Sequence, residues 1–300
     1  MAHDHHHHTI EPRTVNAAFV IGIALNFLFV VIEVIIGLSI HSLSLLSDAG
    51  HNLADVAALS LSLLAYRLMK VRSNENYTYG YRKTSILVAL FNAMVLFISV
   101  GAIAYEAAHR FFNPEPLPGI TIAWVAGIGI IINSVTALLF FRERKKDLNI
   151  RSAYMHLLSD ALVSLGLVIG GVIIFYTGWF WIDPALGILI AIVILFSTWS
   201  LLKESFRLSL DGVPAAMNLQ QVKDAAKKID GVKEVHHIHL WGMSTTENAL
   251  TAHVVIDEKN SLANAEKIKH ELKHALEHLN IQHITLEMET DKENCEEEEC

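Results

Sequence analysis

The stretch "SDAGHNLAD", residues 47–55, places three ionisable side chains, Asp48, His51 and Asp55, among leucines, valines and isoleucines. No lysine or arginine occurs between residues 14 and 66, so the surrounding segment is strongly apolar. A buried ionisable group is costly unless it is paired with another group or coordinated to an ion. The stretch therefore predicts a polar binding site inside an apolar segment.

A second apolar segment, "YMHLLSDAL" at residues 154–162, repeats the spacing His-x-x-x-Asp with His156 and Asp160. On an α-helix, residues four apart lie on one face, one turn above the other. His51 and Asp55 would then point the same way from one helix, as His156 and Asp160 would from another. If the two helices face each other, two imidazoles and two carboxylates form a tetrahedral N₂O₂ set, which suits Zn²⁺.

The charge of this set favours metal transport over a simple polar contact. Two carboxylates and two neutral imidazoles are neutralised by one divalent cation, which can then lie at membrane depth. When the cation leaves, protonation relieves the repulsion between the carboxylates, and histidine titrates near physiological pH. A single such histidine is as often a hydrogen-bond partner between helices, but two His-x-x-x-Asp pairs in separate apolar segments favour the metal site.

Asp48 lies three residues before His51, on nearly the same helical face. Three roles are open to it: a metal ligand, an acceptor for an imidazole N–H, or a relay for protons. We favour the acceptor or the relay over a role as metal ligand, because the four other residues already complete a tetrahedral set.

Composition indicates an integral membrane protein. Of 300 residues, 52% are hydrophobic and 18% are charged, with a mean hydropathy of +0.39, whereas soluble domains carry about 25% charged residues. Residues 206–300 contain 10 basic and 18 acidic side chains, which accounts for the whole net charge of −8. The chain therefore divides into an apolar front and an acidic, water-soluble part. An acidic soluble part argues against a role in binding nucleic acid.

We expect six transmembrane helices, because a bilayer core of about 30 Å is crossed by about 20 apolar residues. The expected spans are approximately residues 15–38, 43–66, 84–108, 120–141, 154–176 and 182–202. Basic residues gather after the second and the fourth span, whereas the opposite side offers only Arg110: Arg67, Lys70, Arg72, Arg82, Lys83, Arg142, Arg144, Lys145, Lys146 and Arg151. Since basic loops stay on the cytoplasmic side, both termini are expected there. The compact length and short loops favour a bacterial inner membrane.

The soluble part reads as a small α+β domain. Amphipathic helices are expected at residues 219–230 and 262–280, and alternating strands at 232–241, 249–257 and 283–289. This αββαβ order predicts a ferredoxin-like domain. The expected divisions are a histidine-rich N-terminus (1–14), a transmembrane domain (15–205), a cytoplasmic α+β domain (206–290) and an acidic tail with two cysteines (291–300).

Histidines also gather outside the apolar front. His236, His237, His239 and His253 lie on the expected strands, where adjacent residues face opposite sides, so His236 and His237 are not expected in one ligand set. His270, His274 and His278 recur every four residues on one face of the expected helix, and we interpret this face as exposed to solvent. The N-terminal run "HDHHHH" and the final "CEEEEC" are open to weak metal capture, and the two cysteines are expected as free thiols.

Several motifs together resemble the cation diffusion facilitator family, specifically its zinc-type members. In the front they are "HSLSLLSDAGHNLAD" (41–55), "YTYGYRKTSILVALFNA" (77–93), "HRFFNPEPL" (109–117) and "YMHLLSDALVSLG" (154–166). In the soluble part they are "GVKEVHHIHLW" (231–241) and "LTAHVVID" (250–257). These motifs follow the family order through nearly the whole chain.

The resemblance implies a homodimeric metal/proton antiporter in the lipid bilayer, with six transmembrane helices and a cytoplasmic metallochaperone-like domain (206–290) that serves metal binding and dimerisation. It implies that His51, Asp55, His156 and Asp160 carry the transported ion, and that two histidines favour zinc over manganese or iron. It also implies a regulatory zinc site at His236 and His253, with an acid near Glu289. By family position, Lys83 and Asp211 would form a charge interlock near the dimer interface. The sequence does not rank Zn²⁺ against Cd²⁺ or Co²⁺ as the exported ion.

Two other function classes compete with a secondary active transporter. An intramembrane zinc enzyme needs three protein ligands, an open position and a general base, but the chain has no H-E-x-x-H motif and the four expected ligands close the shell. A membrane-bound metal sensor would bind without transport, yet it needs no four-ligand site at bilayer depth. Metal flux across a sealed membrane separates these classes.

Overall fold

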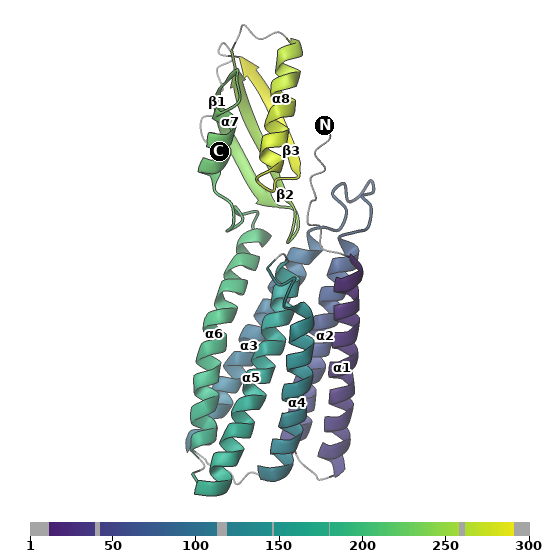
Figure 1. Cartoon of the computed structure of the whole chain (residues 1–300), viewed down its shortest axis with the longest axis vertical. Helices are drawn as coiled ribbons and strands as arrows, with labels where there is room; N and C mark the ends of the chain where they lie inside the picture. The colour runs from purple at the N-terminus through teal and green to yellow at the C-terminus, as the bar shows by residue number, and fades with distance from the viewer. Residues whose placement is uncertain are drawn as a thin grey trace.

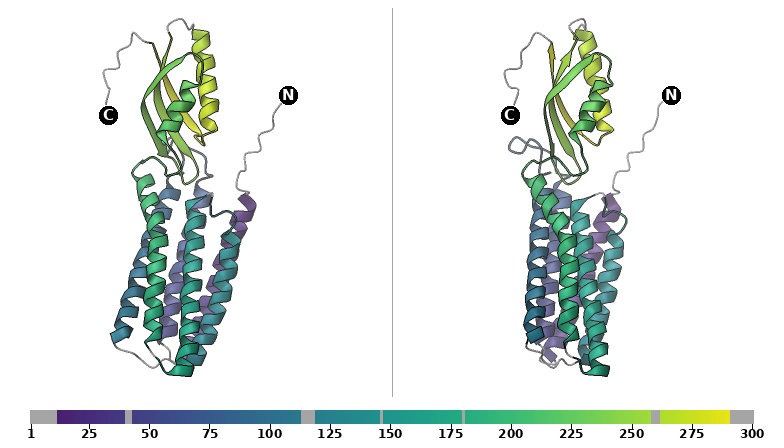
Figure 2. Two further views of the ribbon diagram at one scale, coloured as in Figure 1. Left: turned by 60° about the vertical axis from the view of Figure 1, so that its left-hand side comes forward. Right: turned by 90° about the vertical axis from the view of Figure 1, so that its left-hand side faces the viewer.

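The computed structural model describes residues 12–39, 43–112, 119–145, 147–179, 181–257 and 262–290. Some side chains within the helices, including those of Asp48 and His51, are outside this description. The molecule is elongated, with a bundle of long helices at one end and a small α+β domain at the other (Figures 1 and 2). The expected histidine-rich N-terminus and the acidic tail lie almost entirely outside the described residues.

Six helices of 22 to 30 residues form the bundle within the described part of the chain. At 1.5 Å per residue, each exceeds the bilayer core of about 30 Å. Three described segments are both long and apolar enough to cross a membrane: Ala17–Ile36, Thr84–Phe112 and Ala123–Phe140. The helices are α1 (Pro12–Ser39), α2 (Leu43–Leu68), α3 (Thr84–Phe112), α4 (Gly119–Phe140), α5 (Leu148–Thr177) and α6 (Ile182–Ser209).

Two helices extend further than the expected spans at the end nearer the α+β domain. Helix α5 begins at Leu148 rather than near residue 154, and α6 continues to Ser209 rather than ending near 202. Hydropathy marks only the apolar part of a helix, whereas the helix itself continues until its backbone is capped. At the start of α5, the Asp147 carboxylate supplies that cap by accepting the backbone N–H of Ile150 at 3.0 Å.

Helices α2 and α5 are neighbours inside the bundle, and α5 also contacts α3, α4 and α6. Small residues allow other pairs to approach closely: a Cβ on Gly22 of α1 would lie 2.8 Å from Thr136 of α4. The packing of α2 against α5 brings Asp55 of one His-x-x-x-Asp segment close to His156 and Asp160 of the other in the interior.

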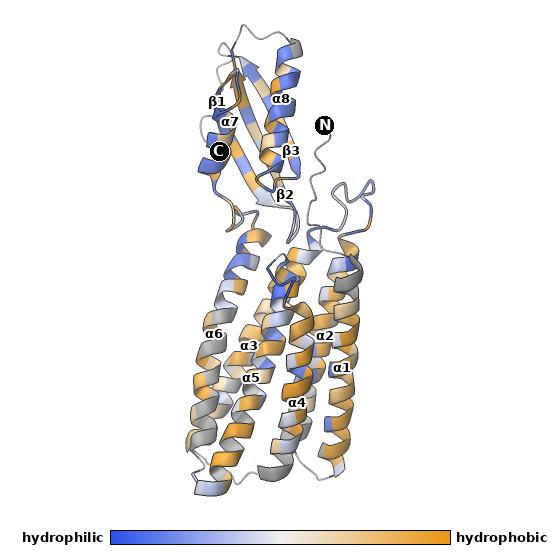
Figure 3. Cartoon of the chain, in the orientation of Figure 1, coloured by the Kyte–Doolittle hydropathy of each residue, from blue (hydrophilic) through white to orange (hydrophobic). Residues whose placement is uncertain are grey.

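The helices of the bundle consist mainly of apolar residues (Figure 3), and many large hydrophobic side chains among them are exposed. Ile98, Trp124 and Phe196 are 71%, 74% and 75% exposed, respectively. An apolar surface of this extent is unfavourable in water and compatible with hydrocarbon. The arrangement agrees with the expected membrane protein.

The α+β domain contains α7 (Leu219–Lys227), β1 (Val232–Gly242), β2 (Asn248–Ile256), α8 (Leu262–Glu277) and β3 (His283–Thr290). This is the αββαβ order that the sequence predicts. Within the described residues the sheet has the order β1-β2-β3, with β1 antiparallel and β3 parallel to the central strand β2.

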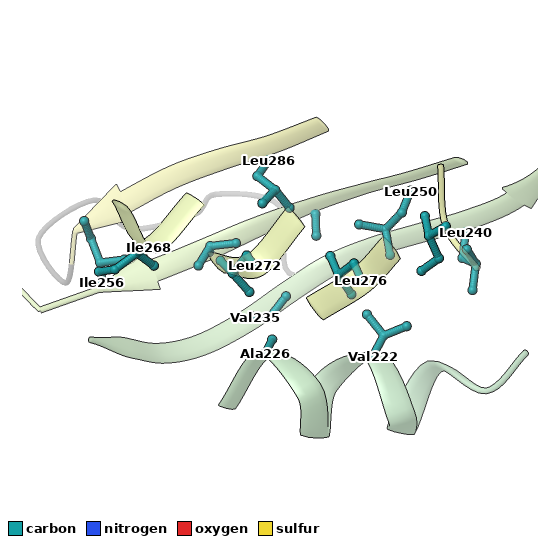
Figure 4. Packing of buried hydrophobic residues seen from close by; sticks show 13 residues of the cluster. Val222, Ala226, Val235, Leu240, Leu250, Ile256, Ile268, Leu272, Leu276 and Leu286 are labelled. Atoms are coloured by element: carbon teal, nitrogen blue, oxygen red, sulfur yellow. The ribbon is translucent and has the colours of Figure 1, made fainter. Parts of the chain in front are cut away.

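Both helices of this domain cover the same face of the sheet (Figure 4). In β2, Leu250, Ala252, Val254 and Ile256 alternate along the strand and pack against residues of α7 and α8. Since alternate residues of a strand face opposite sides, His253 projects from the other face, away from the helices. The sheet therefore separates the apolar core from the histidines.

We expect Leu272→Ala, on α8, to lower the free energy of unfolding of the α+β domain by about 2–5 kcal/mol, because Leu272 is 1% exposed in its core. Urea unfolding of the full chain in detergent, followed through hydrogen exchange of β2, measures this change. His270→Ala is the control, since His270 is exposed on the same helix. Equal losses for both variants would contradict the packing described.

Candidate metal sites

Three ionisable side chains meet inside the bundle: Asp55 from α2, and His156 and Asp160 from α5. Nε2 of His156 contacts Oδ1 of Asp55 and lies 4.0 Å from Oδ2 of Asp160. One donor atom from each residue lies within 4.8 Å of the other two. The residues are only 2%, 5% and 8% exposed, so water gives these groups little solvation.

The local helix geometry explains why two of these groups come from α5. His156 and Asp160 are four residues apart, and the side chains of such a pair share one face. His51 stands in the same relation to Asp55 on α2. Its side chain and that of Asp48 lie outside the described residues, so only their backbone positions in α2 are known. The four-residue set and the role of Asp48 remain predictions.

Further polar contacts join the helices near this cluster. The Asn52 side chain donates a hydrogen bond of 2.8 Å to Glu33, which ties α2 to α1 in the buried interior. The Asn92 side chain donates to the Ser62 hydroxyl at 2.7 Å and so ties α3 to α2. Neither pair could be predicted from the sequence, because its two residues lie on different helices, 19 and 30 positions apart along the chain.

A second cluster lies on the helix-free face of the α+β domain and consists of His236 on β1, His253 on β2 and Glu289 on β3. Nδ1 of His253 contacts Oε1 of Glu289, and Nε2 of His236 lies 3.4 Å from Oε2 of the same carboxylate. Glu287 approaches Nε2 of His253 at 3.5 Å. Neither Nε2 of His236 nor Oε2 of Glu289 has a hydrogen-bond partner among the described residues. Two imidazoles and a carboxylate that converge in this way fit a Zn²⁺ ion.

The expected alternation of β1 is wrong at His237. Val235 and Ile238 both contact the core although three positions separate them, so one extra residue lies between them. His237 has a φ of +49°, and the register with β2 shifts between His236 and His239. A β-bulge with this geometry redirects a side chain. As a result, both the His236 and the His237 rings contact His253, with ring centroids 5.5 and 4.8 Å apart.

The remaining histidines that the sequence singled out lie apart from this set. His239 contacts the His237 ring, with centroids 4.8 Å apart, and is itself exposed. His270 and His274 on α8, and His278 directly after its end, are exposed, as expected for a solvated helix face.

Two ion pairs lie where the bundle meets the α+β domain, and one of them, Arg82–Glu247, joins the two. Lys83, which precedes α3, pairs with Asp211 after α6, and this is the expected pairing of these two residues. Arg82 pairs with Glu247 between β1 and β2. All four side chains are more than one third exposed, so each pair contributes little stability by itself.

Comparison with known proteins identifies the family. A cation efflux transmembrane domain matches residues 19–208, and the cytoplasmic domain of cation efflux proteins matches residues 214–291. The chain belongs to the cation efflux family. This is the cation diffusion facilitator family that the sequence motifs resemble, and its zinc-type members are among the relatives.

Three relatives illustrate the similarity. The chain is 34% identical to the "cadmium, cobalt and zinc/H(+)-K(+) antiporter" of Bacillus subtilis, over 89% of this chain and 86% of that protein. It is 37% identical to the zinc transporter ZitB of Pectobacterium atrosepticum, over 100% and 92%. It is 36% identical to the metal cation efflux system protein CzcD of Cupriavidus metallidurans, over 96% and 89%.

This membership makes the chain a membrane transporter for metal cations rather than an enzyme. The two clusters then differ in their setting. One lies within the transmembrane domain of the family, and the other lies within its cytoplasmic domain.

We expect His253→Ala to weaken zinc binding at the cytoplasmic cluster by about tenfold or more, because His253 contacts both other members of the cluster. Competition titration with a zinc dye measures the affinity, in full-length protein that also carries Asp55→Ala. His270→Ala, an exposed histidine on α8, is the matched control. Unchanged binding in His253→Ala would show that this cluster does not hold zinc.

Charge reversal tests the Lys83–Asp211 pair. We expect Lys83→Asp to slow zinc transport, because it sets two carboxylates against each other where the domains meet. Adding Asp211→Lys restores the opposite charges and is expected to recover part of the rate. Initial zinc flux in vesicles measures both effects, and Arg72→Asp, an exposed change in the same connection, is the control. Failure of the double variant to recover would remove support for the pair.

Proposed function

We propose that the chain is a proton-coupled antiporter that exports Zn²⁺ from the cytoplasm through His51, Asp55, His156 and Asp160. The observation that carries this proposal is the buried convergence of Asp55, His156 and Asp160 from two helices of an apolar bundle. In this family, a buried cluster of ionisable groups at membrane depth is the natural place for the transported cation.

The donor set supports zinc as the substrate. The described groups offer one imidazole nitrogen and two carboxylate oxygens, and His51, one turn from Asp55, would supply the fourth donor. A tetrahedral arrangement of nitrogen and oxygen donors suits Zn²⁺. The name of the Bacillus subtilis relative adds cadmium and cobalt, and nitrogen and oxygen donors bind these divalent ions as well as zinc.

The contact between His156 and Asp55 explains how protons take part. A cation must use the lone pairs of Nε2 of His156 and Oδ1 of Asp55, which contact each other in this arrangement. Loading the cation therefore breaks this contact and displaces the proton that it holds. After the cation leaves, Asp55 and Asp160 repel each other until protons return. Zinc and protons thus compete for the same atoms and move in opposite directions.

The expected topology supports export. The α+β domain lies at the bundle end where the basic connections 69–83 and 141–145 also lie (Figure 1). By the positive-inside rule, this end and both termini face the cytoplasm, and all of α1 to α6 cross the bilayer. We place the protein in a bacterial inner membrane, with lipid covering the apolar surface. The divisions 1–14, 15–205, 206–290 and 291–300 belong to the same proposal.

The cytoplasmic domain has two roles in this proposal. It joins two copies of the chain into a homodimer, and it holds a regulatory Zn²⁺ at His236, His253 and Glu289. The convergence of these three side chains on the open face of the sheet supports the second role. Asp48 is proposed to accept a hydrogen bond from a ligand imidazole or to relay protons.

A membrane-bound metal sensor is the second candidate function, since the cytoplasmic cluster would suit one. Such a sensor would bind zinc at both clusters without flux. Membership of a family of transporters argues against it, and the same membership argues against an intramembrane enzyme.

We expect wild-type protein in liposomes to move zinc inward while protons move outward, and Asp55→Ala to abolish both movements. Removal of Asp55 takes away the carboxylate that contacts His156, so neither ion has its full set of partners. A zinc-sensitive dye and a pH dye inside the vesicles record the two fluxes together. Glu75→Ala, an exposed acid between α2 and α3, is the control and is expected to keep both fluxes.

The outcomes separate the candidate functions. Zinc flux without proton movement would reject the coupling but keep the transporter. Zinc binding without flux in the wild type would favour the sensor. Full activity of Asp55→Ala would move the transport site elsewhere in the bundle.

A further inference from the structure

The loop between β1 and β2 rests on the bundle. Gly242, at its start, lies so close to the bundle that a Cβ there would be 3.0 Å from Leu208 of α6 and 3.8 Å from Ile86 of α3. Figure 2 shows this end of the sheet meeting the ends of the long helices. Met243 and Ser244 are buried at 6% and 2% exposure, so the contact excludes water.

The loop is held in one shape by its own hydrogen bonds. The Ser244 hydroxyl oxygen accepts the backbone N–H groups of Thr246 and Glu247 at 3.1 and 3.0 Å. The backbone N–H groups of Met243 and Ser244 donate to the carbonyl of Glu247 at 2.9 and 3.1 Å. A loop with this internal order can transmit a displacement of β1 or β2 rather than absorb it.

Thr245, at the tip of this loop, bonds to two different parts of the bundle. Its backbone N–H donates to the hydroxyl oxygen of Ser85 at the start of α3, at 3.1 Å. Its hydroxyl donates to Oδ2 of Asp147 at 2.5 Å. The side-chain amide of Asn149 donates to the Ser85 carbonyl at 3.1 Å, so α3 and α5 are joined to each other at the same point.

Asp147 connects this tip to the helix that carries His156. It is 4% exposed, and its other oxygen caps α5 by accepting the backbone N–H of Ile150. Burial raises the pKa of the Asp147 carboxyl, and the hydrogen bonds from Thr245 and from the α5 backbone act against this rise. The Thr245 hydroxyl therefore stabilises the charged form that caps α5.

The two strands that lead into this loop also carry the cytoplasmic cluster: His236 lies on β1 and His253 on β2, directly opposite each other. Along α5, His156 follows Asp147 by nine positions, or about 13 Å of helix. The bond between Thr245 and Asp147 therefore lies between the cytoplasmic cluster and the cluster in the bundle.

We propose that Thr245 and Asp147 are positioning residues for transport, which pass the state of the His236–His253 cluster to the cytoplasmic end of α5. With the contact intact, α5 holds His156 and Asp160 in the arrangement that loads a cation. Without the Thr245 hydroxyl, the start of α5 loses part of its cap and loading requires a higher cation concentration. This inference rests on the function proposed above.

Zinc flux into liposomes by the full-length protein tests this, with initial rates measured over a range of zinc concentrations. We expect Thr245→Val to raise KM for zinc about tenfold, with less than a twofold change in the maximal rate, because a buried carboxylate loses a charge-assisted hydrogen bond. Thr245→Ser keeps the hydroxyl and is expected to restore the wild-type KM. Thr246→Val is the matched control, because its hydroxyl bonds only to Ser244 among the described residues.

A double-variant cycle tests the connection to the cluster. If the signal passes through Thr245, His253→Ala raises KM in the wild-type background but adds little in Thr245→Val. Additive effects, or a Thr245→Val protein with the KM of the wild type, would overturn the inference. Should Thr245→Val fold poorly, Thr245→Ala gives a second test. It removes the same hydroxyl without placing a methyl group against the Asp147 carboxylate, and a wild-type KM in that variant would likewise overturn the inference.

Hydrogen exchange separates this inference from the proposed function. In wild-type protein, zinc at the cytoplasmic cluster is expected to slow exchange in the first two turns of α5, and Thr245→Val is expected to abolish that slowing. This readout does not need transport. An absence of flux in the wild type would reject the proposed function, whereas an unchanged exchange response in Thr245→Val would reject the role of Thr245.

Discussion

The contact between α2 and α5, where Asp55 meets His156, is the constraint on which the rest of the bundle depends. Placing these groups away from water is unfavourable unless they find each other, so the two helices must pack with their polar faces together. Apolar side chains of α1 and α4 pack against this pair, as Phe19 and Phe140 show by joining Leu59 of α2 and Leu157 of α5 in one buried cluster. The packing of α2 against α5 thus decides where the buried ionisable side chains of this cation efflux protein meet.

The α+β domain keeps its ionisable side chains out of its apolar core. Its helices take one face of the sheet, so the histidines of the strands remain on the open face. The strands that hold His236 and His253 continue into the loop that contacts α3 and α5. A small domain therefore offers both a cluster of metal-type ligands and a rigid connection to the bundle.

Much of this arrangement could be predicted from the sequence. Helical spacing predicts that His156 and Asp160 share a face, and strand alternation predicts the apolar side of β2. The β-bulge at His237 could not be predicted, because alternation gives no warning of an inserted residue. The bond from Thr245 to Asp147 could not be predicted either, since it joins residues 98 positions apart that follow no shared pattern. Local periodicity predicts elements and faces, whereas contacts between domains depend on how those elements are finally packed.

The contacts where the bundle meets the α+β domain differ in how strongly dissolved salt weakens them. The pairs Lys83–Asp211 and Arg82–Glu247 are partly open to solvent, so dissolved salt screens them over a Debye length of about 8 Å at physiological ionic strength. The Thr245–Asp147 bond is largely sheltered from such screening by the burial of the Asp147 carboxylate. As ionic strength rises, the outer pairs weaken while the bonds of Thr245 to Asp147 and Ser85 persist, so the link between the domains comes to depend on the buried loop between β1 and β2.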